Sequence, residues 1–259
     1  MPKIDFGFFQ GEKIMRDLKK YLDELVLKYE TADFIDKDPI QFPHRFKTKQ
    51  DIEISALIAS SLAFGKREKI VEAVEKIHTI MQNEPYNFCQ NYKKNDAKIF
   101  QDFKYRYITG ENIANLFEGI AKVLQNFDSL EELFLAKHSQ NHDTVKEGLI
   151  GFVDEILTCD NYLLPCPTKK SACKRLNLFL KWMVRKPPVD LGIWENVDKS
   201  KLIIPLDVHV AKVSRKLGLL QRNANDWQSA YEITTHLRRL DPSDPTKYDF
   251  ALFGAGIGL

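Results

Sequence analysis

The sequence predicts an all-α protein. Through most of the 259 residues, apolar side chains recur three and four positions apart, which places them on one face of a helix. We find no convincing run of alternating apolar and polar residues of the kind that predicts strands. Hydrophobic residues make up 44% of the chain and charged residues 29%, a composition typical of a globular protein with a large buried core.

The same spacing predicts each helix of the N-terminal half in turn. Leu18, Leu22 and Leu25 mark one face of an amphipathic helix over residues 10–30. Residues 51–64 combine apolar positions with Ala and Ser, which is typical of a buried helix with small contact residues. Further helices are predicted over residues 66–81, 112–125, 129–137 and 143–157.

The C-terminal half continues the helical pattern. Residues 169–185 form its strongest predicted helix, and the first turns of that helix are basic. Asp207 is a good N-cap for a helix over residues 207–217, which Gly218 ends. The last predicted helices cover residues 226–239 and 248–253.

Motifs for common cofactors and metals are absent from the sequence. Cys159, Cys166 and Cys173 are spaced seven apart, whereas zinc and iron–sulfur sites usually contain a close cysteine pair. We therefore expect buried cysteines, no metal and no cofactor. No apolar run approaches 18 residues, and residues 1–10 lack the apolar stretch of a signal peptide. The expectation is a cytoplasmic protein without a membrane segment.

Positive charge is concentrated in one segment. Residues 165–222 contain 13 Lys and Arg against 4 Asp and Glu, a net charge of +9. Residues 1–164 carry a net −5 and residues 223–259 a net −2. A solvated helical face explains such a segment, and so does a surface that binds a polyanion.

The basic segment contains both groups that could carry covalent chemistry. Lys170 and Lys174 are four apart, so the predicted helix places them on one face. A lysine amine becomes a nucleophile when burial or a neighbouring cation lowers its pKa, and Lys170, Lys174 and Arg175 crowd one another. Asp207 could act as a carboxylate partner, but composition alone favours a simple helix cap.

The sequence around Asp207 resembles the helix-hairpin-helix DNA glycosylase superfamily. The matching residues are 205–210 (PLDVHV) and 216–219 (KLGL), preceded by a Leu164-Pro165 turn and a lysine-bearing helix. The turn departs from the superfamily pattern, because residues 166–168 (CPT) replace Gly-Val-Gly and Pro167 has no amide hydrogen for a phosphate.

From residue 51 onward the chain more closely resembles a bacterial family of unassigned function within that superfamily. The matching segments are residues 171–177, 182–185, 189–194 and 244–254. The 33 positions from Lys174 to Asp207 are also similar to the long lysine–aspartate spacing of archaeal 8-oxoguanine DNA glycosylases.

The resemblance implies two helical subdomains of the helix-hairpin-helix glycosylase type with a central cleft. It also implies base-excision repair by a DNA N-glycosylase with AP lyase activity. Lys174, with Lys170 as the alternative, would form a Schiff base, and Asp207 would stabilise positive charge on the sugar. The substrate would be double-stranded DNA with an oxidised purine such as 8-oxoguanine, and the enzyme a monomer at the nucleoid. We divide the chain into segments 1–50, 51–160, 161–222 and 223–259.

Further residues are candidates for contacts with DNA. Phosphate contacts are expected from Lys169, Lys170, Arg175, Arg185, Lys212 and Arg215. Trp194 and His209 are candidates for the base pocket, although His209 could instead hydrogen-bond at the helix start. Two alternatives stay open: a non-catalytic nucleic-acid-binding module, and a glycosylase that uses water in place of lysine. The enzyme interpretation requires that Lys174 and Asp207 face one pocket.

Overall fold

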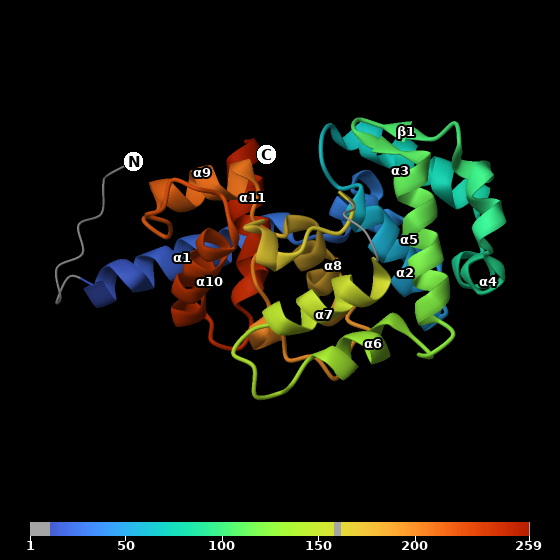
Figure 1. The fold of residues 1–259 in the computed structure, drawn as a ribbon. Helices are drawn as coiled ribbons and strands as arrows, with labels where there is room; N and C mark the ends of the chain where they lie inside the picture. The colour runs from blue at the N-terminus through green and yellow to red at the C-terminus, as the bar shows by residue number, and fades with distance from the viewer. Residues whose placement is uncertain (1–10, 158–161, 259) are drawn as a thin grey trace.

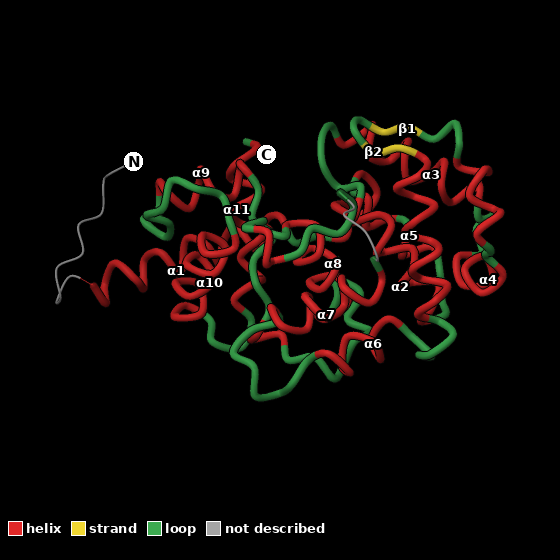
Figure 2. The backbone as a smooth tube through the Cα atoms, in the orientation of Figure 1, coloured by secondary structure: helices red, strands yellow, loops and turns green. Residues whose placement is uncertain are grey.

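The computed structural model describes residues 11–157 and 162–258, and its all-α fold confirms the predicted class (Figures 1 and 2). A short antiparallel hairpin, β1 (Lys104–Tyr105) with β2 (Ile108–Thr109), is the one sheet in this part of the chain. The α-helices are α1 Gly11–Tyr29, α2 Lys49–Ser61, α3 Arg67–Ile80, α4 Pro85–Asn91, α5 Gly110–Val123, α6 Leu130–Lys137, α7 Lys146–Ile156, α8 Lys174–Val184, α9 Val208–Lys216, α10 Trp227–Leu240 and α11 Asp249–Ile257.

The helices form two groups that share one core. Figure 1 shows α1, α9, α10 and α11 at one end of the molecule and α3, α4 and α5 at the other, with α8 between them. Helix α8 packs against α2, and its Leu176, Phe179, Leu180 and Met183 side chains are buried. A continuous cluster of buried apolar side chains therefore runs through α8 from one group to the other.

Each predicted helix overlaps an observed one, but the start of α8 differs from the prediction. The chain forms a 3₁₀ turn at Pro167–Lys169, and Lys170 and Cys173 then adopt left-handed φ angles of 57° and 50°. Because these residues interrupt the helix, α8 begins only at Lys174. The predicted common helical face of Lys170 and Lys174 is therefore wrong. The hairpin and α4 are elements that apolar spacing did not predict.

The first and last described helices pack against each other. Helix α1 contacts α11, and a Cβ atom at Gly254 would lie 2.4 Å from the Tyr29 ring. The Tyr248 hydroxyl also donates a hydrogen bond of 3.0 Å to Asp23 of α1. Residues 1–50 therefore contribute a helix to the same core as the C-terminal residues. Along residues 11–157 and 162–258, no helix is both long and apolar enough to cross a membrane.

Candidate active site

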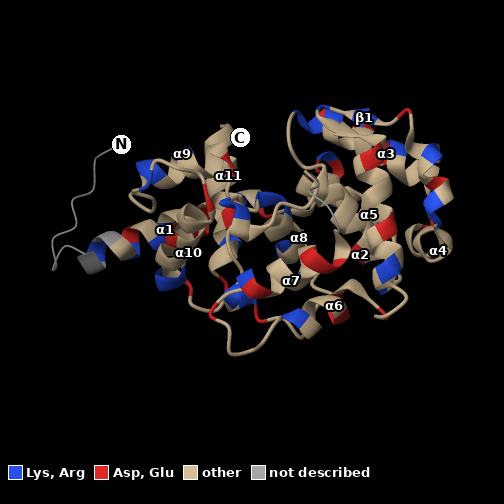
Figure 3. Ribbon diagram, viewed as in Figure 1, with Lys and Arg blue, Asp and Glu red and all other residues tan. Residues whose placement is uncertain are grey.

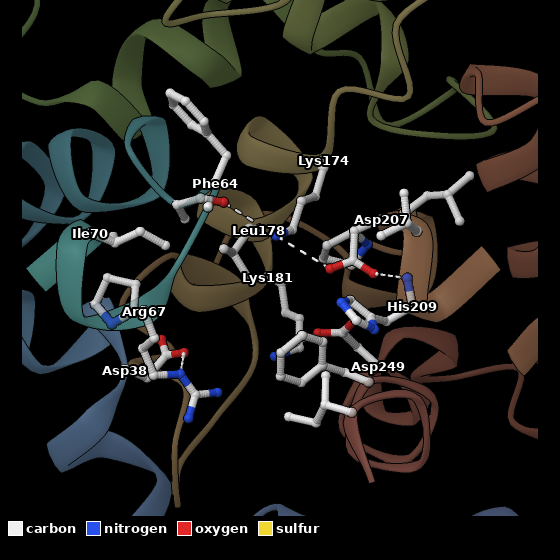
Figure 4. A pocket seen from close by; sticks show the side chains of 18 of the residues that line it. Asp38, Phe64, Arg67, Ile70, Lys174, Leu178, Lys181, Asp207, His209 and Asp249 are labelled. Carbon is white, nitrogen blue, oxygen red and sulfur yellow. Dashed lines mark hydrogen bonds and ion pairs between the residues drawn. The ribbon is translucent and has the colours of Figure 1, made fainter. Parts of the chain in front are cut away.

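A cavity of about 750 Å³ lies between α8 and the start of α9 (Figure 4). Its walls come from residues 34–39, the α2–α3 connection and the start of α3, α8, the lead-in and start of α9, Asn225 of the α9–α10 loop, and α11. Gly65, with a φ of 108°, turns the chain between α2 and α3 at the wall of the cavity. The charged and polar side chains that line the cavity are Asp38, Arg67, Glu68, Lys174, Lys181, Asp207, His209, Asn225 and Asp249.

Lys174 and Asp207 face this cavity together. The Lys174 Nζ atom lies 3.4 Å from Asp207 Oδ2, and it donates a hydrogen bond of 3.2 Å to the carbonyl of Ala63. The two side chains are 29% and 15% exposed, so solvent reaches the pair only in part. The arrangement meets the condition that the enzyme interpretation requires.

Asp207 uses its two carboxylate oxygens for different purposes. Oδ1 accepts hydrogen bonds of 2.9 Å from the backbone N–H groups of His209 and Val210 and thereby caps α9. Oδ2 is the oxygen that faces Lys174. The residue is thus both a helix cap and a pocket carboxylate. The cap fixes its orientation toward the lysine.

Local sequence explains why these two residues meet. The left-handed Cys173 immediately precedes Lys174, so the lysine stands on the first turn of α8. The extended, buried residues 202–206 then carry the chain to Asp207. A hydrogen bond of 3.0 Å from the Ile204 N–H to Thr234 Oγ1 of α10 anchors this lead-in.

A second carboxyl group, Asp249, stands at the start of α11 and also lines the cavity. Its Oδ2 lies 3.6 Å from Nζ of Lys181, a side chain that is only 1% exposed. Burial raises the pKa of Asp249 to about 6, although the Lys181 ammonium group lowers it. Apolar spacing predicted a helix over residues 248–253 and did not single out Asp249.

Asp38 and Arg67 line the side of the cavity opposite Asp249 (Figure 4). Arg67 Nε lies 4.0 Å from Asp38 Oδ2, and the Ile40 N–H donates a bond of 3.1 Å to Asp38 Oδ1. Burial raises the pKa of the Asp38 carboxyl group. The Arg67 guanidinium also lies over the rings of Phe34 and Phe253, at 5.4 and 6.0 Å. These residues belong to elements that carried no prediction of function.

The structure contradicts the prediction that Arg185 contacts a phosphate. Its side chain is 6% exposed and pairs with Glu30 at 2.7 Å, with Asp244 at 3.1 Å and with Asp190. A guanidinium group that is buried among three carboxylates is not available to DNA. Arg185 is a structural residue that ties α8 to α1 and to the turn before α11.

Trp194 is likewise a core residue, not a base-pocket residue. The side chain is buried at 1% exposure, and its indole N–H donates a hydrogen bond of 2.7 Å to Glu53. Its ring contacts Phe134 and Phe179 and does not line the cavity. His209 does line the cavity, with its Nδ1 3.4 Å from the carbonyl of Gly256.

The other predicted DNA contacts fall into two groups. Lys169, Lys170 and Lys212 are exposed. Arg175 donates to the carbonyls of Ser61 and Tyr162, and Arg215 donates to those of Arg222, Asn223 and Ala224. These two arginines therefore hold neighbouring backbone in place, whereas the side chains of the three lysines are exposed.

Part of the basic segment is not at the surface. Lys181 and Arg185, which both belong to it, are buried in ion pairs. Figure 3 shows that Lys and Arg also lie on elements outside this segment, including β1. The net charge of residues 165–222 thus overstates the positive charge that DNA could meet there.

The cysteines that fall within the described ranges are buried. Cys173 donates a hydrogen bond of 3.1 Å from its thiol to the carbonyl of Pro165, and burial raises its pKa to about 12. Cys166 is buried nearby in the chain, and Cys159 lies outside the described residues. Across residues 11–157 and 162–258, no group of three His, Cys, Asp or Glu side chains is arranged to hold a metal ion.

Fold and site together define an all-α protein with a lysine–aspartate pair in a partly enclosed cavity. The chain belongs to the family described as "Protein of unknown function (DUF2400)", which matches residues 38–258. The matched range contains Lys174, Asp207 and Asp249. No curated protein and no solved structure matches the chain.

Proposed function

We propose that this protein is a DNA base-excision repair glycosylase with AP lyase activity, which acts on an oxidised purine such as 8-oxoguanine. The observation that carries the proposal is the 3.4 Å approach of Lys174 Nζ to Asp207 Oδ2 inside the cavity. Glycosylases of this kind need a nucleophile and a carboxylate at one sugar carbon, and both must be reached by an extruded nucleotide.

The two residues can divide the chemistry between them. As the N-glycosidic bond breaks, positive charge develops on the sugar, and the Asp207 carboxylate would stabilise that charge. Lys174, once a proton of its ammonium group has passed to water, would attack the anomeric carbon and form a Schiff base. β-Elimination from this adduct would then cleave the strand. Because Oδ1 of Asp207 is held by the helix cap, the carboxylate needs no reorientation for this role.

The dimensions and chemistry of the cavity suit an extruded nucleotide. A volume of about 750 Å³ lies within the range of small-molecule sites. Phe34, Phe64, Phe250 and Phe253 contribute aromatic surface, and polar groups stand at defined places among them. The exposed Lys169, Lys170 and Lys212 are the remaining candidates for phosphate contacts with double-stranded DNA.

Borohydride trapping tests the proposal directly. The protein is incubated with a panel of duplexes that each carry one lesion, together with an abasic-site duplex. We expect a covalent adduct that is lost in Lys174→Gln and kept in Lys170→Gln, because Lys170 lies outside α8 and does not line the cavity.

Other outcomes have distinct meanings. Loss of the adduct only in Lys170→Gln would retain the enzyme and replace the nucleophile. Base release without an adduct would indicate a water nucleophile activated beside Asp207. No adduct and no alkali-labile site on any duplex would favour a module that binds nucleic acid without catalysis.

A further inference from the structure

We propose that Asp249 is a second catalytic carboxyl group of this cavity, which donates a proton to the departing base, and that Lys181 positions it. The inference rests on the proposed glycosylase function and assigns a role that Lys174 and Asp207 leave open. When the bond to the sugar breaks, the base leaves with an extra electron pair. A proton donor within hydrogen-bond reach of the base lowers the barrier to that step.

The place of Asp249 in the cavity supports this role. Figure 4 shows its carboxyl group beside Lys181, on the other side of the cavity from Asp38. Lys181 is almost completely buried, so little solvent reaches this part of the wall. Asp249 lines the same cavity as Lys174 and Asp207 and lies within electrostatic reach of both, so a nucleotide whose sugar reaches that pair can place its base beside Asp249.

Charge balance explains why Asp249 can hold a proton. Lys181 and Arg185 are the two cations of a buried cluster that contains four carboxyl groups. These are Glu30, Asp190, Asp244 and Asp249. With all of them ionised the cluster would carry two uncompensated negative charges at low solvent exposure, which is unfavourable.

Among these four carboxyl groups, Asp249 is the one most readily protonated. Its contact with Lys181, at 3.6 Å, is the longest ion pair of the cluster, and Lys181 lies closer to Asp190, at 3.2 Å. Asp207 and Asp190 face it as further negative charges, while Lys174 and Lys181 face it as cations. Burial and these carboxylates raise the pKa of Asp249 to about 6.

The step balances as follows. The bond from the sugar C1′ to the base nitrogen breaks, and its electron pair stays with the base. The carboxyl proton of Asp249 moves to the base, while the neutral amine of Lys174 supplies the pair for the new C1′–N bond. The proton that the new adduct loses goes to Asp207 or to water. Asp249 is left as a carboxylate beside the Lys181 ammonium and at the N-terminus of α11, where negative charge is stabilised.

The test compares two substrates in one preparation. A duplex with 8-oxoguanine, or another lesion that the wild type cleaves, requires the base to leave, whereas an abasic-site duplex does not. We expect Asp249→Asn to lower base release by about 100-fold or more and to keep abasic-site trapping near wild type. Retained trapping also shows that the variant is folded, which separates loss of the acid from loss of structure.

Asp244→Asn is the matched control. Asp244 belongs to the same ion cluster and has similar side-chain exposure, 13% against 12% for Asp249, but it does not line the cavity. We expect its ratio of base release to trapping to equal that of the wild type. An equal loss in both variants would overturn the proposal, because cluster charge and not a proton donor would then set the rate.

The pH profile tests the positioning role of Lys181. The rate of base release by the wild type should fall as pH rises above about 6, where Asp249 loses its proton. This fall is the basic limb of the pH profile, and abasic-site trapping should not show it. Lys181→Met removes the cation that lowers the pKa of Asp249, so the limb should move to higher pH. An unmoved limb in a trapping-competent Lys181→Met variant would overturn the positioning role.

Failure of this inference is distinguishable from failure of the glycosylase proposal. Normal base release by Asp249→Asn would overturn the proton donor alone. A wild-type protein that traps no abasic site and releases no base from any duplex would overturn the glycosylase, and the acid with it.

Discussion

Replacing Arg185 with methionine distinguishes a structural arginine from a DNA contact. In the folded protein its guanidinium lies among Glu30, Asp190 and Asp244, whose side chains are 11%, 0% and 13% exposed. Methionine fills much of the same volume but leaves these carboxylates without their cation. Removal of one partner of a buried ion pair costs about 3–5 kcal/mol. For a chain of this size we therefore expect Tm to fall by about 6–20 °C.

Thermal unfolding followed by circular dichroism measures this effect, and Lys186→Met is the matched control. Lys186 is the next residue in the chain, but its ion pair with Glu195 joins side chains that are 62% and 75% exposed. Exposed pairs contribute little to stability, so Tm should hardly change. For both variants, DNA affinity is also measured at several salt concentrations, which gives the slope of log affinity against log salt concentration.

The result that would refute this account is specific. Arg185 would be restored as a DNA contact if the folded Arg185→Met variant kept the wild-type Tm and its DNA affinity depended less on salt. The expected decrease in the slope is that of about one phosphate contact. A large loss of stability with an unchanged slope would support the buried network.

Two further predictions concern a cap and a buried acid. Asp207→Asn keeps an oxygen for the α9 cap but removes the charge beside Lys174, so trapping should fall about 100-fold or more while Tm stays near wild type. Asp207→Ala should also lose the cap, at about 1 kcal/mol in urea unfolding, and an equal Tm for both variants would contradict the cap. Burial raises the pKa of Glu53 from 4.5 to about 7, so the folded state holds this proton more tightly than the unfolded state does. Stability from this group is full below pH 4.5 and is lost as pH rises to about 7, by about 3 kcal/mol. The free energy of unfolding of Glu53→Gln, measured in urea, should lack that decline with pH. An equal pH dependence of the two proteins would refute the prediction.

The fold class and the pair of Lys174 and Asp207 could be predicted from the sequence. Apolar spacing is a local property, so it predicted the helices without knowledge of their packing. The pairing of two residues 33 positions apart came from the resemblance, because the spacing alone equally fitted a solvated lysine and a simple cap.

The remaining site residues depend on contacts that no local pattern contains. Arg185 and Lys186 are adjacent and equally charged, yet one is buried and the other exposed. The partners of Arg185 include Glu30, 155 positions earlier, and Asp244, 59 positions later. Asp249 was missed for the same reason, since it is the first residue of an apolar helix and its pocket neighbours come from α8 and the N-cap of α9.

The contact between α1 and α11 has a consequence for the order of folding. The hydrogen bond from Tyr248 to Asp23 closes a loop of 225 positions, and contacts of such long sequence separation are slow to form. By comparison, the hydrogen bond from Lys174 to the Ala63 carbonyl spans 111 positions. The contact that joins the two ends of the described chain therefore spans about twice the sequence separation of the contact that holds Lys174, and we expect it to form later.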